Sequence, residues 1–167
     1  MPEETAIFKG KLKHSGIFDF KEMYKFAYNL LKEGKQLAVI ERGYGEKVTP
    51  DGKDIEIEWE GIKTISDYFK IKVVVKTKVM KLTNVEAEKE GKKVKMNKAD
   101  LEIVVDAKLI RDFEGKWEKS PFMKFSRSIY DKYIIKNKIS EVEEALARDC
   151  DDFLAQIKGF LSLEANR

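Results

Sequence analysis

Three segments of this chain alternate between apolar and charged residues. In segment 55–60, isoleucine and tryptophan alternate with glutamate, and segments 69–79 and 101–109 repeat the pattern with lysines and mixed charges. Successive side chains of a β-strand point to opposite faces, so each segment predicts a strand with one buried and one solvated face. A sheet built from such strands needs a cover on its apolar side only.

The N-terminal part of the chain predicts two more strands and a helix. Segments 6–14 and 37–44 are interpreted as strands, and residues 45–54 as a loop that turns at Pro50-Asp51-Gly52. A helix is expected from Asp19 to Glu33, because Asp19 and Glu22 have the spacing of a reciprocal N-terminal cap. We expect Gly34 to end this helix in the left-handed conformation.

The C-terminal part predicts two helices. Ser120-Pro121 is typical of a helix start, and a break near Asn137 precedes a long helix from Ser140 to about Leu163. Apolar residues recur along one side of the long helix at a spacing of three or four, and that side is expected to be buried. These residues are Val142, Leu146, Cys150, Phe153, Ile157 and Phe160.

The predicted fold class is α+β, in one domain spanning residues 1–167. We expect an antiparallel meander sheet of about five strands, an N-terminal helix and two C-terminal helices, with the long last helix packed on one sheet face. This element order resembles the helix-grip architecture of START-like proteins, although the second closing helix departs from it. The resemblance implies that an apolar or amphipathic small molecule is held between the sheet and the last helix.

The composition limits the chemistry of the chain. Cys150 is the only cysteine and His14 the only histidine, which excludes an internal disulfide and a zinc site of nitrogen and sulfur ligands. No apolar stretch has the length of a membrane span, so we expect a soluble protein, and the lone cysteine favours a cytoplasmic location. Of the 33 cationic residues 28 are lysine, a bias typical of heat-adapted proteins and also of proteins from AT-rich genomes.

The leading hypothesis is a non-catalytic module that binds an apolar or amphipathic ligand. Bulky aromatic side chains are expected to converge between the sheet and the helices, where they either fill the core or line a pocket. The candidate pocket residues are Trp59, Phe69, Phe122, Phe125, Phe153 and Phe160.

Neither catalysis nor a metal or other cofactor is expected. His14 and Cys150 have no recognisable catalytic motif around them, and Cys150 falls on the apolar stripe. The acidic triplets Glu56, Glu58, Glu60 and Asp149, Asp151, Asp152 are interpreted as solvated surface with lysine neighbours.

Two alternatives remain open. Residues 116–138 carry a net charge of +5 and residues 139–155 a net charge of −5, which suits pairing within one chain or between subunits of a homo-oligomer. The second alternative is a nucleic-acid-binding protein that uses the lysine-rich sheet face, because residues 62–98 contain eleven lysines against four acids. We expect acids on neighbouring strands to neutralise those lysines, with Glu60 opposite Lys72 and Lys72 opposite Asp106. Arg42-Gly43-Tyr44-Gly45 resembles part of an RNA-recognition signature, but we interpret it as a strand end flanked by glycine.

Overall fold

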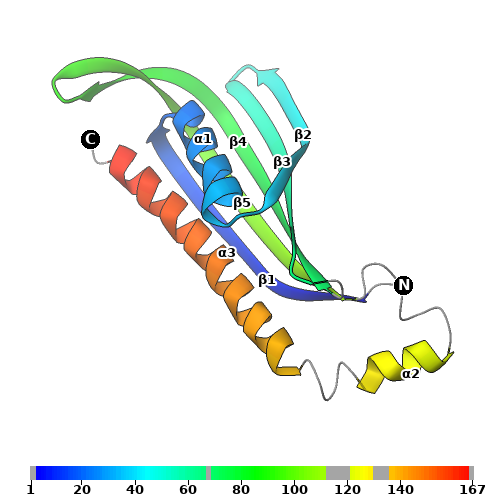
Figure 1. Ribbon diagram of the computed structural model, residues 1–167. Coiled ribbons are helices and arrows are strands. Elements are labelled where there is room, and N and C mark those ends of the chain that lie inside the picture. The colour runs from blue at the N-terminus through cyan, green and yellow to red at the C-terminus, as the bar shows by residue number, and fades with distance from the viewer. Residues whose placement is uncertain (1–2, 67–68, 112–120, 130–135, 166–167) are drawn as a thin grey trace.

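The computed structural model describes residues 3–66, 69–111, 121–129 and 136–165, and it confirms the predicted fold class. The chain forms a five-stranded antiparallel sheet, an N-terminal helix and two C-terminal helices (Figure 1). In chain order the elements are β1 (Glu3–Phe18), α1 (Phe20–Asn29), the π-helical turn η1 (Leu30–Gly34), β2 (Ala38–Thr49), β3 (Gly52–Thr64), β4 (Phe69–Lys89), β5 (Lys92–Arg111), α2 (Pro121–Ile129) and α3 (Lys136–Ala165).

Strands β2 to β5 form a meander, and β1 adds to its far side by pairing with β5. The strand order is therefore β1-β5-β4-β3-β2, and β1 and β2 are the two outer strands. β4 and β5 are the longest strands, and their hairpin extends beyond the ends of the others (Figure 1).

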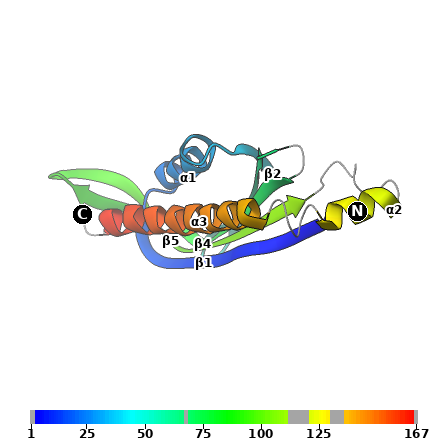
Figure 2. The same ribbon diagram turned by 60° about the horizontal axis from the view of Figure 1, so that its bottom comes forward.

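One face of the sheet is covered by helices, as the alternating segments predict. Ile57, Val73 and Ile103 lie on this face, and all three are buried. α3 runs along β1 and also contacts β5, while α1 lies beside α3 (Figures 1 and 2). Most of the predicted stripe of α3 is buried, but Leu161 takes the last buried position, and Phe160 is only partly buried.

Gly10 sets the distance between β1 and α3. A Cβ at this position would lie 2.8 Å from Cδ1 of Leu154 on α3 and 2.7 Å from the ring of Phe8. Both distances are shorter than real Cβ contacts, so a larger residue at position 10 requires Leu154 and Phe8 to shift.

α1 begins as predicted and ends differently. The backbone N–H of Glu22 donates to Oδ1 of Asp19 at 3.3 Å, which is the expected cap. The regular helix stops at Asn29 and continues through η1, and the positive φ of 58° belongs to Gln36 instead of Gly34.

The predicted loop over residues 45–54 is wrong except for its turn. β2 continues to Thr49 and β3 starts at Gly52, so only Pro50 and Asp51 lie between them. Gly43 and Gly45 consequently lie inside a long strand and not at a strand end. The cross-strand neighbours in β3 stabilise this extended segment in spite of its glycines.

The predicted strand register is wrong by two residues. Glu60 lies opposite Val74, and Lys72 lies opposite Lys108. For β4 and β5, the register follows from the two-residue turn at Glu90-Gly91 and from an irregularity after Met80, where Lys81 has a φ of 57°. A shift of two residues keeps every side chain on its predicted face, because the side-chain period of a strand is two.

Candidate functional site

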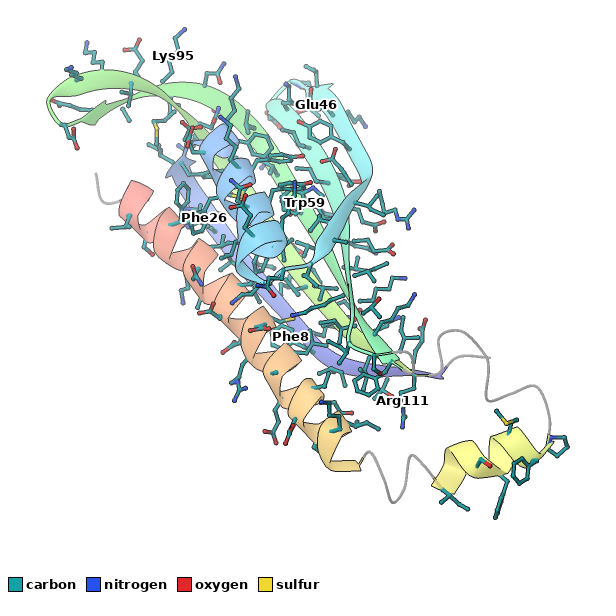
Figure 3. All side chains as sticks on the ribbon, viewed as in Figure 1. Phe8, Phe26, Glu46, Trp59, Lys95 and Arg111 are labelled. Atoms are coloured by element: carbon teal, nitrogen blue, oxygen red, sulfur yellow. The ribbon has the colours of Figure 1, made fainter. Side chains whose placement is uncertain are left out.

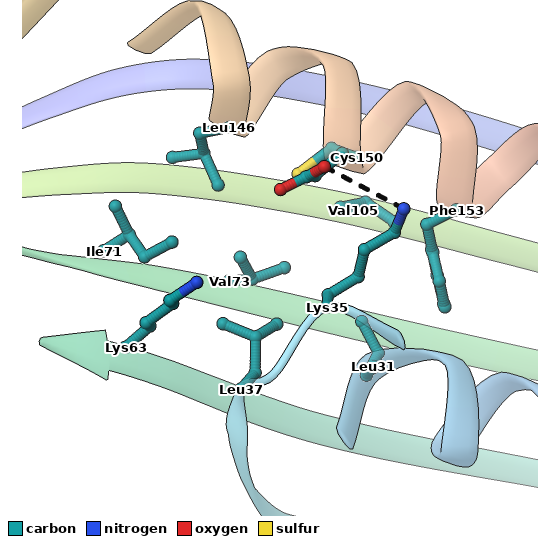
Figure 4. A pocket seen from close by; sticks show the side chains of 11 residues that line it. Leu31, Lys35, Leu37, Lys63, Ile71, Val73, Val105, Leu146, Cys150 and Phe153 are labelled. Atoms are coloured by element: carbon teal, nitrogen blue, oxygen red, sulfur yellow. Dashed lines mark ion pairs between the residues drawn. The ribbon is translucent and has the colours of Figure 1, made fainter. Parts of the chain in front are cut away.

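A small apolar cavity lies between the sheet, α3 and the η1 region (Figure 4). Its volume is about 30 Å³, which has room for no more than a few water molecules. Ile71 and Val73 of β4 and Val105 of β5 form the apolar floor. The remaining apolar lining consists of Leu31, Leu37, Leu146, Cys150 and Phe153.

Three charged residues, Lys35, Lys63 and Asp149, also line the cavity. The ammonium of Lys35 is 2.6 Å from Oδ2 of Asp152 and 3.9 Å from Oδ1 of Asp149, and its side chain is only 15% exposed. This hydrogen bond from Lys35 is the main cause that lowers the pKa of the Asp152 carboxyl below its usual value. Lys35 is thus already neutralised by α3.

Lys63 differs from Lys35 because it has no carboxylate partner among the residues that the structure describes. It lies opposite Ile71, on the face of β3 that also carries Ile57 and Trp59. Continuing the alternation of residues 55–60 to position 63 places Lys63 on this apolar face, so its position could have been predicted from the sequence. Lys35 follows η1, where no periodic pattern marks its role.

Cys150 is a buried thiol in the wall of the cavity. Burial, and to a smaller degree the charge of Asp149, raise the pKa of this thiol to about 12. The thiolate is the nucleophilic form of cysteine, so Cys150 is poorly suited to nucleophilic chemistry at neutral pH. His14 of β1 lies opposite Leu101 of β5 and does not line the cavity. Burial lowers the pKa of its imidazole.

The six predicted pocket residues do not come together. Phe153 lines the cavity, whereas Trp59 and Phe69 are buried at other positions of the core. Phe160 stacks on Phe26 of α1 with ring centroids 5.0 Å apart. Figure 3 shows Phe26 on the side of α1 that is turned toward α3. Phe122 and Phe125 belong to α2, which stands apart from the sheet, and they are 73% and 63% exposed. An amphipathic pattern marks an apolar helix side but does not identify what covers it.

The sequence analysis also missed an aromatic cluster between α1 and β3. Tyr24 and Tyr28 meet the buried ring of Trp59 edge-on, at centroid distances of 5.1 and 5.6 Å. Tyr24 Oη donates to Oε1 of Glu41 at 2.5 Å, and Trp59 Nε1 donates to the same oxygen at 3.2 Å. Desolvation, followed by this bond to Glu41, raises the pKa of Tyr24 to about 12. The cluster fixes α1 to the sheet.

Several lysines of the opposite sheet face pair with acids, and the predicted contact between Glu60 and Lys72 forms although the register differs. Lys76 lies 3.6 Å from Glu58, Lys11 3.2 Å from Glu102, and Lys108 3.6 Å from Glu4. Glu60 accepts from Arg42 at 3.0 Å and lies 3.9 Å from Lys72. Arg42 is the main cause that lowers the pKa of Glu60. These ion pairs reduce the positive field that attracts nucleic-acid phosphates.

Comparisons with known proteins add no information on function. No protein-family model, curated protein or solved structure matches the chain. No helix in the described part of the chain is both long and apolar enough to span a membrane. Within the same residues, no group of three histidine, cysteine or acidic side chains is arranged to hold a metal ion.

Proposed function

We propose that this protein is a binding module for a small amphipathic anion, held between the sheet and α3. One observation carries the proposal: the wall of an apolar cavity includes Lys63, whose ammonium has no carboxylate partner among the described residues. The apolar part of the ligand lies over Val73 and Val105, and its anionic group pairs with Lys63.

The two lysines of the cavity have different roles in this proposal. Lys35 is occupied by Asp152 and Asp149, so it joins η1 to α3 and does not need a ligand. Lys63 lies among apolar neighbours, where an ammonium gains more from a bound carboxylate than it does in open water. Each ligand methylene that leaves water contributes about 0.8 kcal/mol.

Binding includes an opening of the cavity. About 30 Å³ holds no more than a few water molecules, so an alkyl chain enters only when α3 moves away from the η1 region. The contacts that oppose this movement are the ion pair between Lys35 and the half-exposed Asp152, which is of modest strength, and the apolar packing of Leu146 and Phe153. The proposal therefore predicts slower amide exchange in α3 when ligand is bound.

The experiment compares decanoate with decanol by isothermal titration calorimetry, because the two differ in charge and share a chain length. Wild-type protein is expected to bind decanoate saturably and about tenfold more tightly than decanol. Lys63→Gln is expected to abolish this preference. Lys13→Gln removes an exposed lysine from the opposite sheet face and is the matched control, which keeps the preference.

A second variant tests the location of the apolar part. Val73→Phe fills the cavity floor, so it is expected to weaken binding of both compounds while the protein stays folded by circular dichroism. Absence of saturable decanoate binding to wild-type protein, or equal affinity for acid and alcohol, overturns the proposed function.

A further inference from the structure

α2 is a short helix whose apolar side is exposed. Phe122 is 73%, Phe125 63% and Ile129 39% exposed. The three residues follow one another at spacings of three and four, so they lie along one side of the helix. In Figure 1, α2 stands apart from the sheet and from α3. The described part of the chain therefore leaves this apolar side largely uncovered.

The sheet offers no apolar surface to α2. Arg111 lies at the end of the sheet nearest to α2 (Figure 3), and Phe69 pairs with it. At this end Phe69, Ile71 and Leu109 are all buried. The apolar face of the sheet is thus already covered where α2 comes closest, and a partner for the helix has to come from elsewhere.

The charge of the segment favours an anionic partner. α2 contains Lys124 and Arg127 but no acidic residue, and residues 116–138 as a whole carry a net charge of +5. By the helical period, positions 124 and 127 fall on the side opposite Phe122 and Phe125. Two copies of such a segment repel each other, whereas an anionic surface attracts it. Charge therefore argues against pairing of α2 with a second α2.

We propose that α2 binds the surface of an anionic lipid bilayer, with its axis in the plane of the membrane. A bilayer combines an apolar layer for Phe122, Phe125 and Ile129 with anionic headgroups for the cationic side. The acidic part of α3 in a second copy supplies the charge but no apolar surface, because its apolar stripe is buried against the sheet. With 9 residues, α2 is about 14 Å long, so it lies on a membrane and does not span it.

The residues that flank α2 in the sequence are of types enriched at membrane surfaces. Trp117, Tyr130 and Tyr133 combine an aromatic ring with a polar atom, and such side chains concentrate in the headgroup region. Lys119 and Lys132 add cationic groups on both sides of the helix sequence. Lysine places its ammonium among headgroups while its methylenes stay in the apolar boundary. The composition of the segment thus agrees with that of interfacial amphipathic helices.

The exposed acids of α3 limit the contact to α2. Glu141, Glu144 and Asp151 are exposed, and an anionic surface repels them. We therefore expect α3 and the sheet to stay outside the headgroup layer while α2 enters it. The inference is independent of the ligand proposed above, because none of the residues that line the cavity belongs to α2.

Vesicle flotation with the full chain tests the proposal. Vesicles of phosphatidylcholine alone are compared with vesicles that also contain phosphatidylglycerol, and wild-type protein is expected to bind the anionic vesicles at least tenfold more tightly. Phe122→Ser combined with Phe125→Ser is expected to weaken this binding at least tenfold. Val48→Ser removes an exposed apolar side chain from β2 and is the matched control, which keeps the binding. Lys63→Gln is also expected to keep it, which separates this surface from the cavity.

A fluorescent probe locates the contact. Ile129→Cys and Val48→Cys each add one accessible thiol, and Cys150 stays unlabelled because it is buried. A nitrobenzoxadiazole label at position 129 is expected to become brighter and to shift to shorter wavelengths with anionic vesicles. The label at position 48 is expected to remain unchanged. It lies next to the turn between β2 and β3, at the opposite end of the sheet from α2 (Figure 1).

Several results overturn the proposal. They are absence of binding to anionic vesicles, equal binding to neutral and anionic vesicles, and a label at position 129 that stays unchanged while the protein binds. Analytical ultracentrifugation without lipid examines a second copy as the occupant. Self-association that is lost in the variant with Phe122→Ser and Phe125→Ser identifies that occupant and also overturns the proposal. Circular dichroism melting is expected to be the same for this variant and wild type, because both side chains are exposed.

Discussion

Burial of Cys150 makes its thiol unreactive. Its pKa of about 12 leaves about one thiolate in 10⁴ at pH 8. We therefore expect native protein to resist alkylation by iodoacetamide at this pH for hours, and unfolded protein to react within minutes. Intact mass spectrometry measures both rates. Rapid labelling of the native protein contradicts the burial of Cys150 against the sheet.

Tyr24 and Tyr28 differ in whether their hydroxyl groups are hydrogen-bonded, so substituting each by phenylalanine isolates the contribution of one hydrogen bond. Tyr24→Phe deletes the hydroxyl that donates to Glu41 and is expected to lower the free energy of unfolding by about 1 kcal/mol. The hydroxyl of Tyr28 has no hydrogen-bond partner among the described residues, so Tyr28→Phe is expected to be nearly neutral. Urea denaturation compares the two variants, and equal losses contradict the role of the Glu41 contact.

At the scale of elements, Lys35 joins η1 to α3 in a pH-dependent way. A carboxyl with a lowered pKa stabilises the fold above its unfolded pKa, and this stabilisation is lost as the pH falls through the folded pKa. Asp152 is in this state because of Lys35. Lys35→Met is therefore expected to lose less stability than wild type when the pH falls from about 6 to about 3.

Urea denaturation at several pH values measures this difference. Lys13→Met is the control, because Lys13 lies on the other face of the sheet. It is expected to keep the acid sensitivity of wild type. Parallel pH curves for wild type and Lys35→Met contradict the contribution of the ion pair.

The contact of α3 with β1 depends on Gly10. Gly10→Val is expected to destabilise the protein by about 1–3 kcal/mol, because the new side chain overlaps Leu154. Gly159 lies in α3 with no atom of the described residues within 4 Å of an added Cβ. Gly159→Ala is expected to stabilise by about 0.5–1 kcal/mol through helix propensity. Thermal unfolding of both variants checks these opposite signs.

For the molecule as a whole, the sequence predicted which face of each strand is buried, but it did not predict the strand register or the lining of the cavity. The alternation around Ile57, Val73 and Ile103 identified the buried face, since the period of a strand is a local property. The register was wrong because it follows from the turn at Glu90-Gly91, which periodicity does not specify. The cavity was only partly foreseen, because Lys35 and Leu37 reach it from a connection without a repeating pattern.

The exposed side of α2 shows a second property that the sequence does not predict, namely whether an apolar helix side is covered. Its apolar residues Phe122, Phe125 and Ile129 have the spacing of a core-facing helix, yet all three are exposed in the structure. Spacing alone does not distinguish a helix that packs on its own chain from one that does not. Phe153 has the same kind of spacing on α3, and there the sheet covers it.

The pairing of β1 with β5 has a consequence for biosynthesis. β1 leaves the ribosome before its partner strand is made, since Lys9 pairs with Asp106 and the whole meander separates them. Such high contact order slows folding, because the entropy of closing a long loop is lost before the new contacts form. The nascent N-terminal segment therefore leaves Phe8 and Leu12 exposed until both β5 and α3 have been synthesised.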